Sequence, residues 1–176
     1  MHLDQIKTST KVMNELMDWT ALEVADGRLQ ELTLKALPSE IELDDVVLLR
    51  LARNLVNLRT LRLKFLENTS EQTRSALARM TKEIVEIEAP ITVLELYRTG
   101  FTSDDGEKVI EALISTGTST VKALNFSHNP VWWSNNEAFT ENFVQFLTQQ
   151  KQLIGVTLSG NNLSNAIQDQ IRSAAS

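Results

Sequence analysis

The chain has 176 residues and a formal net charge of −6, with 42% hydrophobic and 23% charged residues. This length is enough for one domain with a buried core, and the acidic balance argues against nucleic acids or membrane surfaces as partners. There is no cysteine, and the two histidines lie far apart in the sequence. Disulfide bonds and cysteine metal sites are therefore excluded, and a histidine zinc site is disfavoured.

The chain begins with a segment, residues 3–18, whose apolar positions follow helical spacing. Leu22 and Val24 then alternate with other residues before Asp26-Gly27, a dipeptide typical of tight turns. The segment lacks the basic-then-apolar layout of a secretory signal, and no apolar run approaches the roughly 20 residues needed to cross a bilayer. We therefore expect a cytoplasmic protein whose first element is a helix.

An apolar motif with anchors at its first, fourth and sixth positions recurs along the rest of the chain. Its copies begin at Leu29, Leu58, Ile91, Val121 and Leu153, at spacings of 29, 33, 30 and 32 residues. The alternation within each copy predicts a strand, and the expected strands are 31–35, 60–64, 93–97, 123–127 and 155–159. The central anchors should align in one buried column, formed by Leu32, Leu61, Leu94, Leu124 and Val156.

The segments between these strands have helical apolar spacing and begin with polar capping patterns. Three of them fit a capping box, Ser39-x-x-Glu42, Thr69-x-x-Gln72 and Ser134-x-x-Glu137, and Thr102-x-x-Asp105 is a weaker variant. Ser164 is placed to cap a last, shorter helix. Because each strand-to-strand connection is a long crossover, the strands should be parallel.

The last two strand motifs continue into a longer signature. Asn129 and Asn161 each follow the final anchor by three residues, and an apolar residue lies two positions further on. This pattern resembles the leucine-rich-repeat family, and the full helices point to its ribonuclease-inhibitor-like type. The resemblance implies an α/β fold, a right-handed horseshoe solenoid with parallel inner strands and outer helices. Residues 29–176 would form this domain, and residues 1–28 would be an N-terminal cap covering its first repeat.

Because the anchors face the core, their neighbours along each strand should line the inner surface. Charged and aromatic residues at these positions cluster in the middle three repeats, with the polar Asn125 among them: Arg62, Lys64, Phe65, Glu95, Tyr97, Arg98, Asn125 and His128. Glu95 is the one acid among them. We therefore predict a basic and aromatic binding face for an acidic protein or peptide.

The fourth repeat has a longer connection between strand and helix than the others, and the excess contains Trp132-Trp133. Loops at this rim are exposed, and two adjacent tryptophans are hard to bury together in a turn. We expect one ring to cover the edge of the repeat and the other to contact a partner.

The sequence contains no catalytic, nucleotide-binding or metal-binding motif, so we expect no enzyme activity, cofactor or metal. The acidic pairs Asp44-Asp45 and Asp104-Asp105 follow expected caps and are interpreted as helix-start charges. The favoured function is a protein-interaction module or scaffold. The alternatives are a GTPase-activating protein, a cytoskeletal regulator of the tropomodulin kind, or a host-directed bacterial effector.

Overall fold

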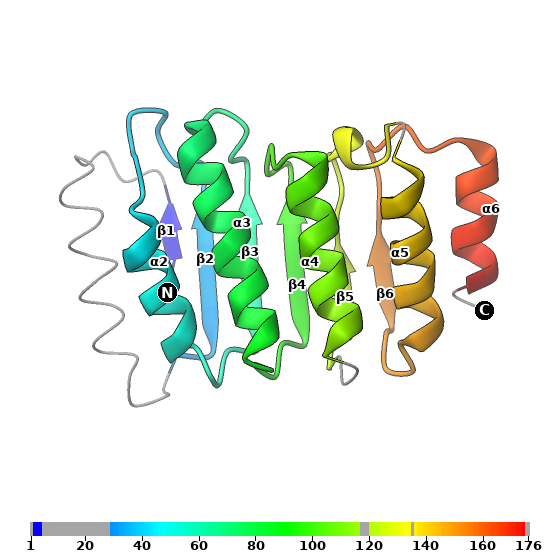
Figure 1. The fold of residues 1–176 in the computed structure, drawn as a ribbon, viewed down its shortest axis with the longest axis horizontal. Coiled ribbons are helices and arrows are strands. Elements are labelled where there is room, and N and C mark those ends of the chain that lie inside the picture. Colours follow the sequence, from blue (N-terminus) through cyan, green and yellow to red (C-terminus); the bar gives the residue numbers. More distant parts are fainter. Residues whose placement is uncertain (1, 5–28, 117–119, 135, 175–176) are drawn as a thin grey trace.

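The protein is described by a computed structural model that covers residues 2–4, 29–116, 120–134 and 136–174. It is an α/β protein in which parallel strands form one sheet in chain order and alternate with helices (Figure 1). The strands are β1 (His2–Asp4), β2 (Glu31–Lys35), β3 (Thr60–Lys64), β4 (Val93–Tyr97), β5 (Ala123–Asn125) and β6 (Gly155–Thr157). The helices are α2 (Asp45–Asn54), α3 (Glu71–Glu86), α4 (Ser103–Ser115), α5 (Glu137–Gln149) and α6 (Asn165–Ala174), with a 3₁₀ turn η2 (Pro130–Trp132).

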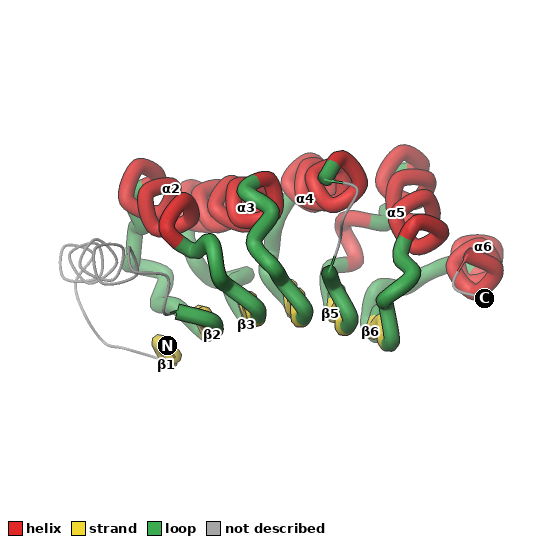
Figure 2. The backbone as a smooth tube through the Cα atoms, turned by 90° about the horizontal axis from the view of Figure 1, so that it is seen from below, coloured by secondary structure: helices red, strands yellow, loops and turns green. Residues whose placement is uncertain are grey.

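The helices all lie on one side of the sheet, and the strands follow an arc (Figure 2). The other side of the sheet carries no helix within the part of the chain that the structure describes. We call this side the inner face. It lies on the hollow side of the arc. Among the described residues, none of the helices is both long enough and apolar enough to cross a membrane.

The strand register places the central anchors side by side. Leu32 pairs with Leu61, Leu61 with Leu94, Leu94 with Leu124, and Leu124 with Val156. The predicted column is therefore confirmed, and its first four members are fully or almost fully buried. Val156 is only half-buried, because no further strand lies beyond β6 among the described residues.

The two ends of the sheet differ from the prediction. The expected helix over residues 3–18 is wrong at its start, because His2–Asp4 forms a sixth strand that pairs in parallel with β2. The rest of that helix and the short segment at Leu22 and Val24 lie outside the described residues. Both β5 and β6 end two residues earlier than expected. In β5 the Asn125 side chain accepts a hydrogen bond from the Ser127 N–H at 3.0 Å, which turns the backbone away.

Three of the predicted helix caps are wrong. The residues that cap α2, α3 and α5 are Asp44, Ser70 and Asn136 rather than Ser39, Thr69 and Ser134. Two of the predicted side chains are committed to the preceding turn. The Thr69 hydroxyl donates to the Leu66 carbonyl at 2.7 Å, and the Ser134 hydroxyl donates to the Pro130 carbonyl at 2.9 Å.

The predictions for the other two caps are confirmed. Thr102 and Asp105 form a complete capping box at the start of α4, although their pattern is the weakest in the sequence. The Ser164 hydroxyl accepts the Ile167 N–H at 3.3 Å at the start of α6. Asp105, the third residue of α4, has a shorter side chain than the glutamate usual in a capping box. Its carboxylate nevertheless accepts hydrogen bonds from both the Thr102 N–H and the Thr102 hydroxyl.

The two signature asparagines hold adjacent turns together. The Asn129 side-chain amide donates to the Leu96 and Phe126 carbonyls at 2.7 and 3.1 Å, and its oxygen accepts the Thr99 N–H at 3.0 Å. Asn161 repeats the pattern one unit later, where its oxygen accepts the Asn129 N–H at 2.7 Å. Both asparagines thus satisfy backbone groups where the strands end.

Candidate functional site

The inner face is built by strand alternation. In β3 and β4 the leucines at alternate positions point to the helices, so Arg62, Lys64, Glu95 and Tyr97 point to the inner face. Asn125 occupies the equivalent place in β5, directly beside Glu95 in the register. These predicted residues are therefore brought together over three adjacent strands.

Glu95 is at the centre of a polar network on this face. Its carboxylate lies 2.8 Å from the Lys64 Nζ and 3.4 Å from the Arg62 Nε, and it accepts a hydrogen bond from the Asn125 amide at 3.0 Å. The Glu95 side chain is only 16% exposed. Such a shielded carboxylate, with three partners on the two flanking strands, holds the neighbouring side chains in fixed positions.

The expected basic patch is an ion-paired surface. Arg62 also pairs with Glu31 on β2, and the Arg98 Nε lies 2.6 Å from the Glu67 carboxylate. The expectation that Glu95 is the one acid is therefore wrong for this surface. Glu31 could have been found from the sequence, because strand alternation places it two residues before Thr33 on the same face. Glu67 follows the strand in a turn, where alternation gives no guidance.

An aromatic row crosses the same face next to the network. The ring centroids of Phe65 and Tyr97 lie 5.0 Å apart, and those of Tyr97 and His128 lie 5.1 Å apart. The row ends at Gly160, where an added Cβ would lie 2.4 Å from the His128 ring. The residues of the row remain partly exposed. The structure thus gathers the three predicted aromatic side chains into one continuous row.

The backbone at the end of each strand explains how the row forms. The residue two positions after the last anchor has a positive φ in every repeat: 50° at Ala36, 54° at Phe65, 51° at Arg98, 59° at His128 and 72° at Gly160. The left-handed region is costly for residues with a side chain, by about 1 kcal/mol or more each. The regular alternation of the strand ends at this residue. The side chains of Phe65 and His128 therefore lie beside Tyr97, whereas continued alternation would have turned them to the opposite face of the sheet.

The prediction of an exposed tryptophan at the rim is wrong. Trp132 is 0% exposed and Trp133 is 5% exposed. The 3₁₀ turn at Pro130–Trp132 projects consecutive side chains in different directions, so both rings enter the core from one loop. The exposed apolar residue of the loop is Val131, at 48%.

Each tryptophan has its own place in the core. Trp132 packs on Gly106 of α4, where a Cβ would lie 2.8 Å from the indole, and its Nε1 donates to the Phe101 carbonyl at 3.1 Å. The Trp133 ring meets Phe139 and Phe143 of α5 edge-on, at centroid distances of 4.8 and 5.1 Å. Neither ring adds an apolar anchor to the inner face.

The acidic pairs lie at helix starts, as expected. Asp44 caps α2 and Asp45 is in its first turn, while Asp104 and Asp105 are in the first turn of α4. Within the described ranges no group of three or more potential metal-binding side chains is found. These pairs therefore have a helix-stabilising role in the structure.

No protein-family model matches the chain, and no curated protein is recognisably similar to it in sequence.

Proposed function

We propose that the chain is a leucine-rich-repeat protein of the ribonuclease-inhibitor-like type. In this proposal residues 29–176 form a right-handed horseshoe, and residues 1–28 cap its first repeat. The support is the repeat of about 30 residues, the parallel strands in chain order, the curved sheet with helices on one side, and the asparagine bonds between adjacent turns. Parallel crossovers are almost always right-handed.

The proposed activity is non-catalytic binding of a protein partner by the inner face. The observation that carries this proposal is the partly exposed row of Phe65, Tyr97 and His128 across three repeats. Aromatic side chains contribute most at the centre of protein interfaces, where they bury large areas at low entropic cost. The rigid network around Glu95 would present this row without rearrangement on binding.

The paired charges define which partner this face suits. Arg62, Lys64 and Arg98 each have a carboxylate neighbour, so an acidic partner would have to displace Glu31, Glu95 or Glu67. Breaking a shielded pair to form a similar one gains little free energy. We therefore propose a peptide segment that places apolar or aromatic residues on the row, with charged residues setting only the surrounding specificity.

A photo-crosslinking residue at Tyr97 tests this proposal, with the same residue at exposed Glu111 on α4 as the control. A partner captured at Tyr97 and absent at Glu111 would identify the ligand of the inner face. Its affinity for Tyr97→Ala, measured by calorimetry, should then fall roughly 30-fold or more, as for a central aromatic residue. Equal capture at both positions, or unchanged affinity in Tyr97→Ala, would place the binding surface elsewhere.

A further inference from the structure

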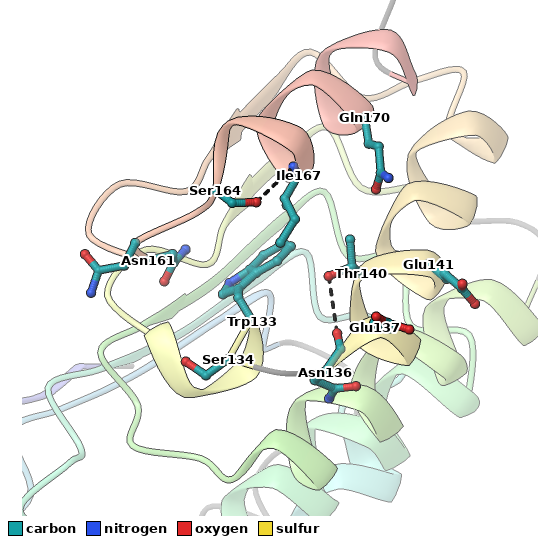
Figure 3. Close-up of a pocket in the computed structure, with 11 residues that line it drawn as sticks. Trp133, Ser134, Asn136, Glu137, Thr140, Glu141, Asn161, Ser164, Ile167 and Gln170 are labelled. Atoms are coloured by element: carbon teal, nitrogen blue, oxygen red, sulfur yellow. Dashed lines mark hydrogen bonds between the residues drawn. The ribbon is translucent and has the colours of Figure 1, made fainter.

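A separate pocket lies on the helix side of the molecule, between α5, α6 and the η2 turn (Figure 3). Its volume is about 620 Å³, within the range of small-ligand sites. Trp133 and Ile167 give it an apolar wall, while Glu137, Glu141 and Gln170 are among its polar side chains. None of these residues belongs to the inner face.

The pocket carries negative charge without a counter-charge. Glu137 and Glu141 lie one turn apart on α5 and are exposed, and neither has a hydrogen-bond or ion-pair partner within the described residues. The pocket lining contains no lysine or arginine. The helix dipole accounts for Glu137 in the first turn of α5, but its effect falls off before Glu141 in the second. The two carboxylates together would attract a cation.

The Trp133 ring, which lines the same pocket, contains an unsatisfied donor. Its Nε1 is buried and has no acceptor among the described residues, whereas the neighbouring Trp132 donates to a carbonyl. A buried N–H without an acceptor costs free energy, so such groups are rare in folded proteins. A ligand that brings a hydrogen-bond acceptor to the Trp133 Nε1–H would therefore satisfy a donor that has no partner in the described part of the chain.

The wall beside Trp133 belongs to the least buried helix among the described residues. Ile167 of α6 lines the same pocket as Trp133 (Figure 3) and is only half-buried. The described residues of α6 include no fully buried side chain, in contrast to α2, α3, α4 and α5. A small outward shift of α6 would thus widen the pocket beside the Trp133 ring while disturbing little packing.

We propose that this pocket binds an arginine residue of a peptide in extended conformation. The guanidinium lies between Glu137 and Glu141, the aliphatic part of the side chain packs on Ile167 and Trp133, and a peptide carbonyl accepts the Trp133 Nε1–H. Arginine offers five donors and no acceptor, so the acceptor has to come from its backbone. This site is independent of the partner proposed for the inner face.

The test uses the blocked tripeptide acetyl-Ala-Arg-Ala-amide and its citrulline analogue, which has nearly the same shape and no charge. Binding is followed by the indole N–H signals in ¹H–¹⁵N spectra of the full chain, with the Trp133 signal assigned by its loss in Trp133→Phe. We expect the arginine peptide to shift the Trp133 signal in a saturable way. The citrulline peptide should bind roughly tenfold more weakly, since it loses both charge contacts.

Two matched variants locate the binding. Glu137→Gln with Glu141→Gln should weaken arginine-peptide binding roughly tenfold, by the same reasoning. Glu31→Gln with Glu95→Gln removes two carboxylates from the inner face and should leave this binding unchanged. No shift of the Trp133 signal, equal shifts with both peptides, or a loss of binding only in the inner-face variant would each overturn the proposal. None of these outcomes depends on the partner of the inner face.

Discussion

The middle of the sheet and its C-terminal end carry the same apolar motif but bury it to different degrees. Leu61 and Leu94 are completely buried, whereas Val156, at the equivalent position, is half-buried. The helices differ in the same way, since α3 buries eight residues and the described part of α6 buries none. The motif therefore determines which face of a strand is apolar, and the presence of neighbours on both sides determines how far that face is buried.

The hydrogen bonds between turns show the same difference. Asn129 lies between two repeats and bonds to groups of its own repeat and of the repeat before it, while its N–H is accepted by Asn161. Asn161 has the corresponding bonds on one side only, because no described repeat follows it. Three matched pairs of substitutions test whether the position of a residue within the sheet determines how much stability its substitution removes.

The largest difference is expected between Leu96→Ala and Leu158→Ala, which remove the same atoms from the same motif position. Leu96 is fully buried and Leu158 is half-buried. Leu96→Ala should lower the free energy of unfolding by about 4 kcal/mol and Leu158→Ala by about 1–2 kcal/mol, because only the first leaves an enclosed cavity. Urea unfolding followed by circular dichroism measures both values.

An unchanged dependence on urea would show that the two variants unfold from comparably compact states. Similar losses in both variants would mean that Leu158 is covered in solution. Repeating the measurement at a tenfold different protein concentration would then reveal whether a second copy covers it.

A smaller difference is expected between Asn129→Ala and Asn161→Ala. Asn129→Ala leaves the buried Thr99 N–H and the Leu96 carbonyl without partners and should cost about 3 kcal/mol. Asn161→Ala leaves the buried Asn129 N–H without its acceptor, but the Phe126 carbonyl keeps the Asn129 amide as a donor, so the cost should be lower, about 1–2 kcal/mol. Differential scanning calorimetry of both variants provides the comparison, and a larger loss for Asn161 would contradict it.

The smallest difference is expected between two glycines. At Gly106 an added methyl group would meet the Trp132 ring at 2.8 Å, whereas at Gly155 in β6 nothing lies within 4 Å. Gly106→Ala should cost about 1–3 kcal/mol despite the better helix propensity of alanine, because the packed indole has to move. Gly155→Ala should be neutral within about 0.5 kcal/mol. Their melting temperatures report the result, and a stable Gly106→Ala would show that the indole can shift at low cost.

The strands could be predicted to within a residue or two because their signal is local. The strands β2, β3 and β4 have the predicted bounds, since in each of them two leucine anchors alternate with the other residues of the strand. The helix caps were less predictable. Ser39 and Asp44 both suit a cap by residue type, and the tertiary position of α2 decides in favour of Asp44.

The candidate site was predictable in its strand members but only partly in its electrostatics, since strand alternation reveals Glu31 but not Glu67. The repeat spacing identifies Tyr97 and Arg62, because each inner-face position stands at a fixed offset from the apolar anchors of its repeat. The acids that pair with arginine on this face, Glu31 and Glu67, come from neighbouring positions on other strands and turns. Burial of Trp133 could not be foreseen, because it depends on the shape of a 3₁₀ turn and on the Phe139 ring that it meets.

The chain-order arrangement of the strands bears on how the protein is made. From β2 onward, every strand pairs with the strand that precedes it in the chain, about 30 residues earlier. A ribosome releases residues in that same order, at about 5–20 per second. When a repeat leaves the exit tunnel, the strand with which it pairs has therefore already been synthesised. No described repeat depends on a pairing partner from later in the chain.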